Sequence, residues 1–218
     1  MGPSRTAFSS RRSYILYIGL SVTLATCLAT LLGFTVLTFT DISALTPYTG
    51  ELGRLIGIVS DTHDNLEAVR EFAPELNEFG VDVLLHAGDY IAPFTLPELA
   101  RVECEEFIGV FGNNDGERDF LREKAEELGF EIVGEVFTGE VLGLKVAMVH
   151  GVHEEVVEAF AASGEYDLVV YGHTHEPDVR KVGDTLVVNP GEACGYVTGE
   201  RSVAVLDPDK LEVEIIKF

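Results

Sequence analysis

Basic residues are scarce in this chain of 218 residues. Lysine and arginine together number 15 against 37 aspartates and glutamates, so the formal net charge is −22 at pH 7. A surface with this excess of negative charge repels the phosphate backbone of DNA or RNA over most of its area. The composition therefore argues against general nucleic-acid binding.

Cysteine is scarce as well. The three cysteines, Cys27, Cys104 and Cys194, lie far apart and form no C-x-x-C motif. Neither a disulfide framework nor a thiolate zinc site is indicated, and a reducing compartment is the default expectation. The sequence also lacks a P-loop, a G-x-G-x-x-G dinucleotide motif and a G-x-S-x-G nucleophile motif.

Hydrophobic residues, by contrast, make up 46% of the chain and include 13 phenylalanines and 7 tyrosines. This content supplies a core and excludes disorder for most of the chain. At roughly 150 residues per domain, the length predicts one domain with an appendage. We expect an apolar N-terminal segment over residues 1–52 and one folded domain over residues 53–218.

The N-terminal segment contains no charged side chain between residues 13 and 40. This run exceeds the roughly 20 residues that cross a bilayer, and the arginines before it would keep the N-terminus in the cytoplasm. A cleaved signal peptide is disfavoured, because the run is too long and no A-x-A site follows. Two alternatives stay open: a single membrane helix that anchors the protein, or translation from near Leu52 and a cytoplasmic protein.

The remainder alternates short apolar runs with polar turns and amphipathic stretches, which is typical of βα units, and it becomes richer in strands in its second half. In the helix expected at 116–128, Phe120, Leu121, Lys124 and Leu128 should share one side. The expected strands are 55–60, 81–86, 107–111, 135–138, 145–149, 167–171, 178–182, 185–188, 203–206 and 211–216, and the expected helices are 65–79, 97–102, 116–128 and 154–162.

Polar clusters follow five of the expected strands at their carboxyl ends. They are Asp61-Thr62-His63, Gly88-Asp89, Gly112-Asn113-Asn114-Asp115, His150-Gly151 and Gly172-His173-Thr174-His175. Ligand sites of open α/β sheets lie at this edge. A single cluster of this kind is usually a helix cap or a turn, but five in order are hard to explain by capping.

The residue types in these clusters suit a metal site. Imidazole together with carboxylate fits manganese, iron, zinc, nickel or cobalt better than magnesium. Seven candidate ligands exceed the needs of one tetrahedral ion, whereas two ions that share a bridging carboxylate would use them all. Such a pair, roughly 3.5 to 4 Å apart, stabilises the attacking and leaving oxygens of a phosphoryl displacement.

In this order, the motifs D-x-H, G-D, G-N-x-D, H-G and G-H-T-H resemble those of the calcineurin-like metallophosphoesterase superfamily. Residues 58–65, 84–89, 112–115, 172–175 and 189–191 are most similar to its small single-domain phosphodiesterase branch, which is related to the retromer subunit of that fold. The resemblance covers about residues 53–218. It implies an α/β fold of four layers, a two-sheet sandwich flanked by helices, with a dimetal site at one sheet edge.

The resemblance also implies the roles of individual residues. Two divalent ions are expected, with manganese as the first choice and nickel, iron, cobalt or zinc as alternatives. Asp89 and Asn113 are the implied catalytic residues, and a water between the ions would attack phosphorus. The implied metal ligands are Asp61, His63 and His175 for one ion, Asn113, His150 and His173 for the other, and Asp89 for both.

Other positions near these motifs have separate expectations. Many members of the superfamily have histidine where this chain has Asn114, and an amide cannot protonate a leaving group, so we expect modest rates on poor leaving groups. Asp115 is expected to orient a ligand or a backbone amide. We expect His86 to be a buried structural residue and His153 a surface residue.

The sequence thus predicts a metal-dependent phosphoesterase, a hydrolase that cleaves small phosphodiesters in preference to phosphomonoesters through a metal-bridging hydroxide. The alternative is a metal-stabilised, non-catalytic scaffold or interaction module of the same fold. The presence of all seven candidate ligands favours the enzyme. Membrane contact is expected only if residues 13–40 are translated, and homo-oligomer formation stays open.

Overall fold

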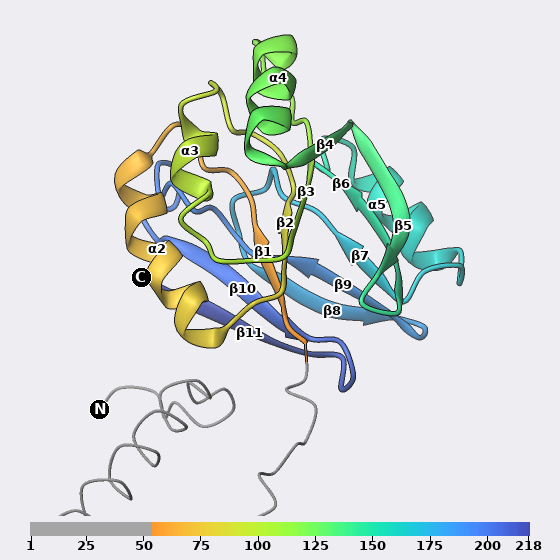
Figure 1. Ribbon diagram of the computed structural model, residues 1–218. Helices are drawn as coiled ribbons and strands as arrows, with labels where there is room; N and C mark the ends of the chain where they lie inside the picture. The colour runs from red at the N-terminus through yellow and green to blue at the C-terminus, as the bar shows by residue number, and fades with distance from the viewer. Residues whose placement is uncertain (1–53) are drawn as a thin grey trace, which may run out of the picture. The chain divides into compact units, whose positions relative to one another are not determined.

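The first half of the domain is built of βα units, as the sequence predicts (Figure 1). The structure is a computed structural model that describes residues 54–218. Four strands pair in parallel, so their carboxyl ends meet at one edge of the sheet. The elements of this half are β1 (Ile56–Val59), α2 (Leu66–Phe79), β2 (Val83–His86), α3 (Thr95–Leu99), β3 (Glu106–Val110), α4 (Arg118–Leu128) and β4 (Glu131–Gly134).

The second half is richer in strands and in antiparallel pairing. Three hairpin pairs, β5 with β6, β8 with β9 and β10 with β11, account for most of it. Its elements are β5 (Val136–Val141), β6 (Leu144–Val149), α5 (Glu154–Ala162), β7 (Leu168–Val170), β8 (Asp178–Val182), β9 (Thr185–Asn189), β10 (Ser202–Asp207) and β11 (Glu212–Lys217).

The strands form two sheets. The first has the order β11-β10-β1-β2-β3-β4 and the second the order β5-β6-β7-β9-β8. Helices α2, α3 and α4 lie along the first sheet, and α5 lies on the other side of the sandwich against the second sheet (Figure 1). The predicted two-sheet sandwich flanked by helices, in four layers, is therefore confirmed.

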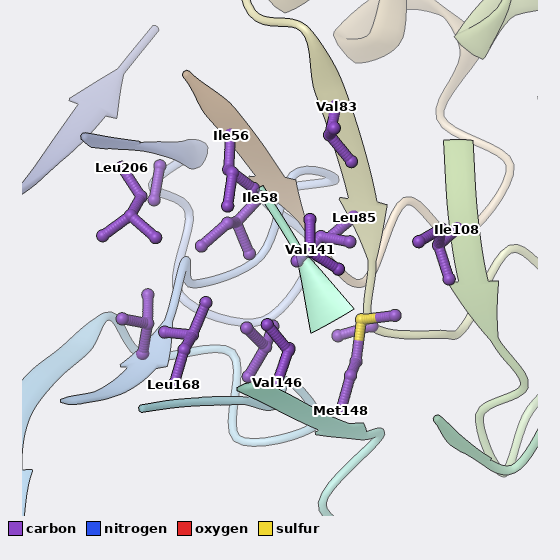
Figure 2. Packing of buried hydrophobic residues seen from close by; sticks show 14 of the residues in the cluster. Ile56, Ile58, Val83, Leu85, Ile108, Val141, Val146, Met148, Leu168 and Leu206 are labelled. Carbon is purple, nitrogen blue, oxygen red and sulfur yellow. The ribbon is translucent and has the colours of Figure 1, made fainter. Parts of the chain in front are cut away.

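Aliphatic side chains fill the space between the two sheets (Figure 2). On the first sheet, Ile56 and Ile58 point inward, and they meet Met148 and Leu168 of the second sheet. The residue between them, Gly57, faces the opposite way, where a side chain at this position would contact Leu76 of α2. This alternation, the period of two of a strand, fixes which face of β1 belongs to the core.

Helix α2 has clear signals at both ends. Asn65 caps its start, since its Oδ1 accepts a hydrogen bond from Ala68 N at 3.2 Å, and Gly80 ends it in the left-handed region at φ 72°. Asn65 also donates through Nδ2 to the carbonyl oxygen of Cys194 at 2.8 Å. The cap therefore joins the loop after β1 to the loop after β9, and both loops reach the functional site.

Two features of the region around α4 differ from the sequence prediction. Phe120 is 62% exposed, and the buried positions of the helix are Leu121 and Ala125. The helix begins at Arg118, and the spacing of four between Leu121 and Ala125 sets its inner face, so Phe120 lies outside it. The edge strand β4 was not predicted, because its four residues alternate between exposed and half-buried or buried positions and carry little apolar signal.

Residues 1–53 lie outside the described residues, and with them lie both expectations for the N-terminal segment and the expected boundary after residue 52. Within residues 54–218, no helix has the length and apolar character needed to cross a bilayer.

His86 ends β2 and is fully buried, as expected. Its Nδ1 accepts a hydrogen bond from Gly88 N at 3.1 Å, so the ring proton is on Nε2, which lies 3.2 Å from Thr62 Oγ1. The ring stacks on Tyr90 with 3.9 Å between centroids. Burial lowers the pKa of His86 to about 3, so the imidazole is neutral in the folded protein.

The depressed pKa predicts that His86 makes the fold sensitive to acid. The unfolded chain takes up the imidazole proton near pH 6.5 and the folded chain near pH 3, so stability is lost as the pH falls through this window. Between pH 7 and pH 5 the wild type should lose about 2 kcal/mol more unfolding free energy than His86→Gln. Urea unfolding in excess chelator measures this. A His153→Gln control at an exposed site should behave as the wild type, and an equal loss in His86→Gln would contradict the prediction.

Candidate functional site

The polar loops of both sheets meet at one edge of the sandwich. Backbone hydrogen bonds join the loop after β1 to the loop after β2, from Asp61 N to Gly88 O at 3.1 Å and from His63 N to Asp89 O at 3.0 Å. The first sheet contacts the second through His150, whose Nδ1 lies 2.8 Å from Ala87 O. Loops distant in sequence are therefore held together before any ligand is considered.

Two carboxylates and three imidazoles form the centre of this edge. Asp61 Oδ1 lies 3.6 Å from His63 Nε2, 3.9 Å from His150 Nε2 and 3.5 Å from His175 Nε2. Asp89 Oδ2 lies 3.4 Å from His63 Nε2 and 3.2 Å from His150 Nε2. Five of the seven predicted ligands thus direct their ligand atoms at one another.

The remaining two predicted ligands lie beside this centre. The ring of His173 is 5.1 Å from that of His150, and its backbone N–H donates to Asp61 Oδ2 at 3.0 Å. Asn113 and His150 line one pocket of about 300 Å³. The structure therefore brings all seven predicted residues to the same edge of the sandwich.

The backbone is strained at most of these positions. Five of the seven predicted ligands have positive φ, although none of them is glycine: Asp61 at 54°, His63 at 42°, Asp89 at 62°, His173 at 69° and His175 at 64°. The left-handed region costs such residues roughly 1 to 3 kcal/mol each, and strain of this kind collects at functional sites. The bend of each strand end turns alternating side chains toward one point.

Glycine allows the loops to approach this closely at two positions. A Cβ on Gly112 would lie 2.1 Å from Asp89 Oδ1, and one on Gly172 would lie 1.8 Å from Ser60 Oγ and 2.7 Å from Asp61 Oδ2. Each glycine is thus packed directly against a carboxylate of the centre, where a side chain would displace it.

Three ligand atoms at the centre lack a hydrogen-bond partner. Among the residues that the structure describes, four buried side-chain atoms are unpaired, and Asp61 Oδ1, His63 Nε2 and His150 Nε2 are three of them. Because Nδ1 of His150 faces a carbonyl oxygen, its Nε2 directs an electron pair at the carboxylates. Unpaired buried acceptors that converge on one point are the arrangement that a divalent cation requires, so these residues fit a metal.

The carboxylates of the centre are held ionised. Burial opposes the ionisation of Asp89, but the nearby His150 ring and the hydrogen bonds from Asn114 outweigh it and hold its pKa well below the usual range. For Asp61, burial is likewise outweighed by His63, His150 and Ser60, and its pKa is lowered. The pKa of His63 is raised, chiefly by Asp61. Two ionised carboxylates therefore lie together at this edge of the sandwich, beside imidazoles.

Both the sequence and the fold of this chain are similar to those of known proteins. The calcineurin-like phosphoesterase superfamily domain matches residues 55–211. A phosphodiesterase of Methanocaldococcus jannaschii is 41% identical over 158 residues, which cover 72% of this chain and 95% of the relative. The chain belongs to the calcineurin-like phosphoesterase superfamily. The predicted resemblance and the prediction of a phosphoesterase are both confirmed.

Two solved structures share the fold of this calcineurin-like phosphoesterase. An archaeal phosphodiesterase superposes with a TM-score of 0.72 at 39% identity, and the match covers 75% of this chain and 99% of the other. Wild-type Vps29 of Entamoeba histolytica in complex with zinc superposes with a TM-score of 0.53 at 19% identity, covering 75% and 98%. The likeness to Vps29 shows the fold alone.

Two residues hold the Asp89 carboxylate and its loop. Asn114, at the position where many superfamily members have histidine, donates from its backbone N to Asp89 Oδ1 at 2.9 Å and from Nδ2 to Oδ2 at 2.7 Å. Asp115 accepts hydrogen bonds from the backbone of Asp89, Ile91 and Gly112 at 3.0, 2.8 and 2.7 Å. The expectation that Asp115 orients backbone amides is confirmed, whereas the contact of Asn114 with Asp89 was not predicted.

Glu192 is the residue of the phosphoesterase site that the sequence did not reveal. It is fully buried, and its Oε2 lies 2.8 Å from Nδ1 of His175. The same carboxylate accepts hydrogen bonds from the backbone of Tyr196, Val197 and Thr198, and from the Thr198 hydroxyl. Burial raises its pKa, but these bonds outweigh that effect and lower the pKa to about 2. Glu192 is an isolated glutamate that follows Pro-Gly and precedes Ala-Cys-Gly. Because a charge in apolar surroundings needs partners, this pattern could have indicated its role.

Cys194 lies at the same side of the site. Its Sγ and ligand atoms of His63 and His175 all lie within 4.8 Å of one another. Burial and the Glu192 carboxylate, whose Oε2 is 3.0 Å from the sulfur, raise the pKa of the thiol to about 12. Cys194 is therefore a neutral thiol in this arrangement and not a nucleophile.

Replacing Glu192 should destabilise the domain strongly. In Glu192→Gln an uncharged amide would replace the acceptor of several backbone N–H groups, and we expect a loss of roughly 2 to 4 kcal/mol of unfolding free energy. Glu200→Gln is the matched control, because the side chain of Glu200 is 64% exposed and pairs with Lys217 at the surface. Its effect should stay below about 0.5 kcal/mol. Urea unfolding of both variants measures the difference, and similar losses would refute the structural role of Glu192.

Proposed function

We propose that the domain is a dinuclear, divalent-metal-dependent phosphodiesterase. The observation that carries this proposal is the convergence of three unpaired buried atoms, Asp61 Oδ1, His63 Nε2 and His150 Nε2, at the sheet edge. The phosphodiesterase of Methanocaldococcus jannaschii supports diesters as the substrate class, because it is 41% identical to this chain. Asp61, His63 and His175 would hold one ion, Asn113, His150 and His173 the other, and Asp89 both.

When bound, two divalent ions would lower the pKa of a bridging water and supply a hydroxide to attack phosphorus. The chain's own residues orient the reaction. Asn114 fixes both oxygens of the Asp89 carboxylate, and Asn113 can offer an amide N–H to a phosphate oxygen. Because the amide of Asn114 supplies no proton, water protonates the departing alkoxide, which favours substrates with good leaving groups. Manganese remains the first choice of metal.

Metal binding should stabilise the domain with a stoichiometry of two ions per chain. Partnering the buried carboxylates removes their repulsion, and each ion at a hundred times its dissociation constant adds about 2.7 kcal/mol, so two ions add about 5.4 kcal/mol. The midpoint of thermal unfolding in Mn²⁺ should therefore lie roughly 10 to 20 °C above that of the chelated protein. Elemental analysis gives the stoichiometry, and a single ion per chain would contradict the bridging role of Asp89.

Asp89→Asn should abolish hydrolysis. Loss of the bridging charge should lower the turnover of bis-p-nitrophenyl phosphate in Mn²⁺ by more than roughly a hundredfold. Asp119→Asn is the matched control, because Asp119 lies on α4 with its side chain 99% exposed, and it should keep wild-type turnover. An Asp89→Asn enzyme with full activity would refute the site assignment.

A metal-stabilised scaffold is the second candidate, favoured by the zinc complex of Vps29, which shares the fold. The two candidates differ in one outcome. The scaffold is supported if the protein holds two ions per chain and hydrolyses no phosphodiester with Mn²⁺, Ni²⁺, Co²⁺ or Zn²⁺. The enzyme is supported if the protein hydrolyses a phosphodiester and a chelator abolishes that activity.

A further inference from the structure

An apolar pocket of about 300 Å³ lies beside the candidate metal centre. It is bounded by the loop after β3, the start of β5, the end of β6 and the first turn of α5, on the side of the sandwich where Figure 1 places β5 and α5. Two of its lining residues, Asn113 and His150, belong to the seven predicted ligands. The pocket is therefore continuous with the place where a phosphate would bind.

Exposed valines gather in this pocket. Val136 of β5 is 51% exposed, Val152 of the loop after β6 is 45% exposed and Val156 of α5 is 41% exposed, and all three line it. Aliphatic side chains are usually buried, and three that are open to solvent at one concave place, from three separate segments, indicate a ligand surface. A volume of this size holds one ring and excludes a long polymer.

The charged groups of the pocket already have partners. The Arg118 guanidinium donates to the carbonyl oxygens of Gly112 and Asp115, each at 3.1 Å, and to Glu135 Oε1 at 2.6 Å. The same guanidinium lies 5.2 Å from the centroid of the Phe111 ring. Because Arg118 and Glu135 neutralise each other, the guanidinium is not free to bind a second phosphate, and an uncharged occupant suits the valine-lined part of the pocket better.

We propose that this pocket binds an uncharged aromatic ester group of the phosphodiester substrate. The proposal rests on the proposed function, since the phosphate of the same molecule lies at the metal centre between Asn113 and His150. The substrate class is then a small diester with at least one aromatic substituent, and Val136, Val152 and Val156 form the surface that the ring contacts.

Two hydrolysis-resistant anions test the pocket. Diphenylphosphinate and dimethylphosphinate carry the same charged group, but only the first has rings. Against hydrolysis of bis-p-nitrophenyl phosphate, diphenylphosphinate should inhibit about tenfold more tightly than dimethylphosphinate. In Val136→Asn and Val156→Asn the ratio of the two inhibition constants should fall toward one. Val179→Asn is the matched control, because Val179 of β8 is 44% exposed and does not line the pocket, and it should keep the ratio.

A second measurement is independent of turnover. In Zn²⁺-loaded protein with labelled valine methyl groups, diphenylphosphinate should shift the resonances of Val136, Val152 and Val156 and leave Val179 unchanged. Equal inhibition by both phosphinates, with hydrolysis intact, would overturn the aromatic subsite alone and leave the valines as a surface for a protein partner. Absence of hydrolysis with Mn²⁺, Ni²⁺, Co²⁺ and Zn²⁺ would instead overturn the proposed function and, with it, this proposal.

Discussion

Two buried carboxylates at one edge of the sandwich, Asp61 and Asp89, are the constraint on which the rest of the site depends. Both are fully buried, and the pKa of each is lowered, so both are ionised at neutral pH. Paired negative charges in surroundings of low dielectric are unstable without compensation. The imidazole nitrogens around them lie 3.2 to 3.9 Å from the carboxylate oxygens, and Nε2 of His63 and of His150 has no hydrogen-bond partner. Positive charge at this point, from protons or from cations, is therefore a condition of the fold as well as of the chemistry.

Holding these groups together requires support from the surrounding loops. Five of the seven ligand positions have positive φ, which costs conformational energy, and hydrogen bonds from neighbouring residues offset that cost. Asn114 and Asp115 hold Asp89 and its loop, and Glu192 joins His175 to the backbone of residues 196–198. Each of these residues contacts a predicted ligand or the backbone beside it. Hydrogen bonds from these outer residues, of which Asp115 and Glu192 are buried, therefore hold the ligand side chains in place, while three of the inner ligand atoms stay unpaired.

Residues that belong to a recurring pattern, an apolar strand followed by polar residues, could be predicted from the sequence. Single residues outside such a pattern could not. Buried strands such as β1 and β2 were predicted because their apolar runs end in polar residues at parallel strand ends. The seven candidate ligands followed from that periodicity together with the family resemblance. Glu192 was not predicted, because its partners are backbone groups that only the folded loop brings together. The misplaced Phe120 and the unpredicted β4 have a similar cause: at an edge, a few apolar residues do not determine which face is covered.

The net charge of −22 and a phosphate substrate are compatible when distance is considered. Exposed charges separated by more than about 8 to 10 Å are largely screened at physiological salt, so a long polyanion would meet the acidic surface, whereas a small diester in the proposed pocket would meet only the charges beside it. Within that pocket, Arg118 and Glu135 cancel each other, and the valines contribute no charge. The two carboxylates of the centre therefore dominate the local field, and bound cations would reverse its sign at the point where the phosphate must lie. The acidity of the chain thus argues against long polyanionic substrates and not against a small substrate that carries one phosphate group.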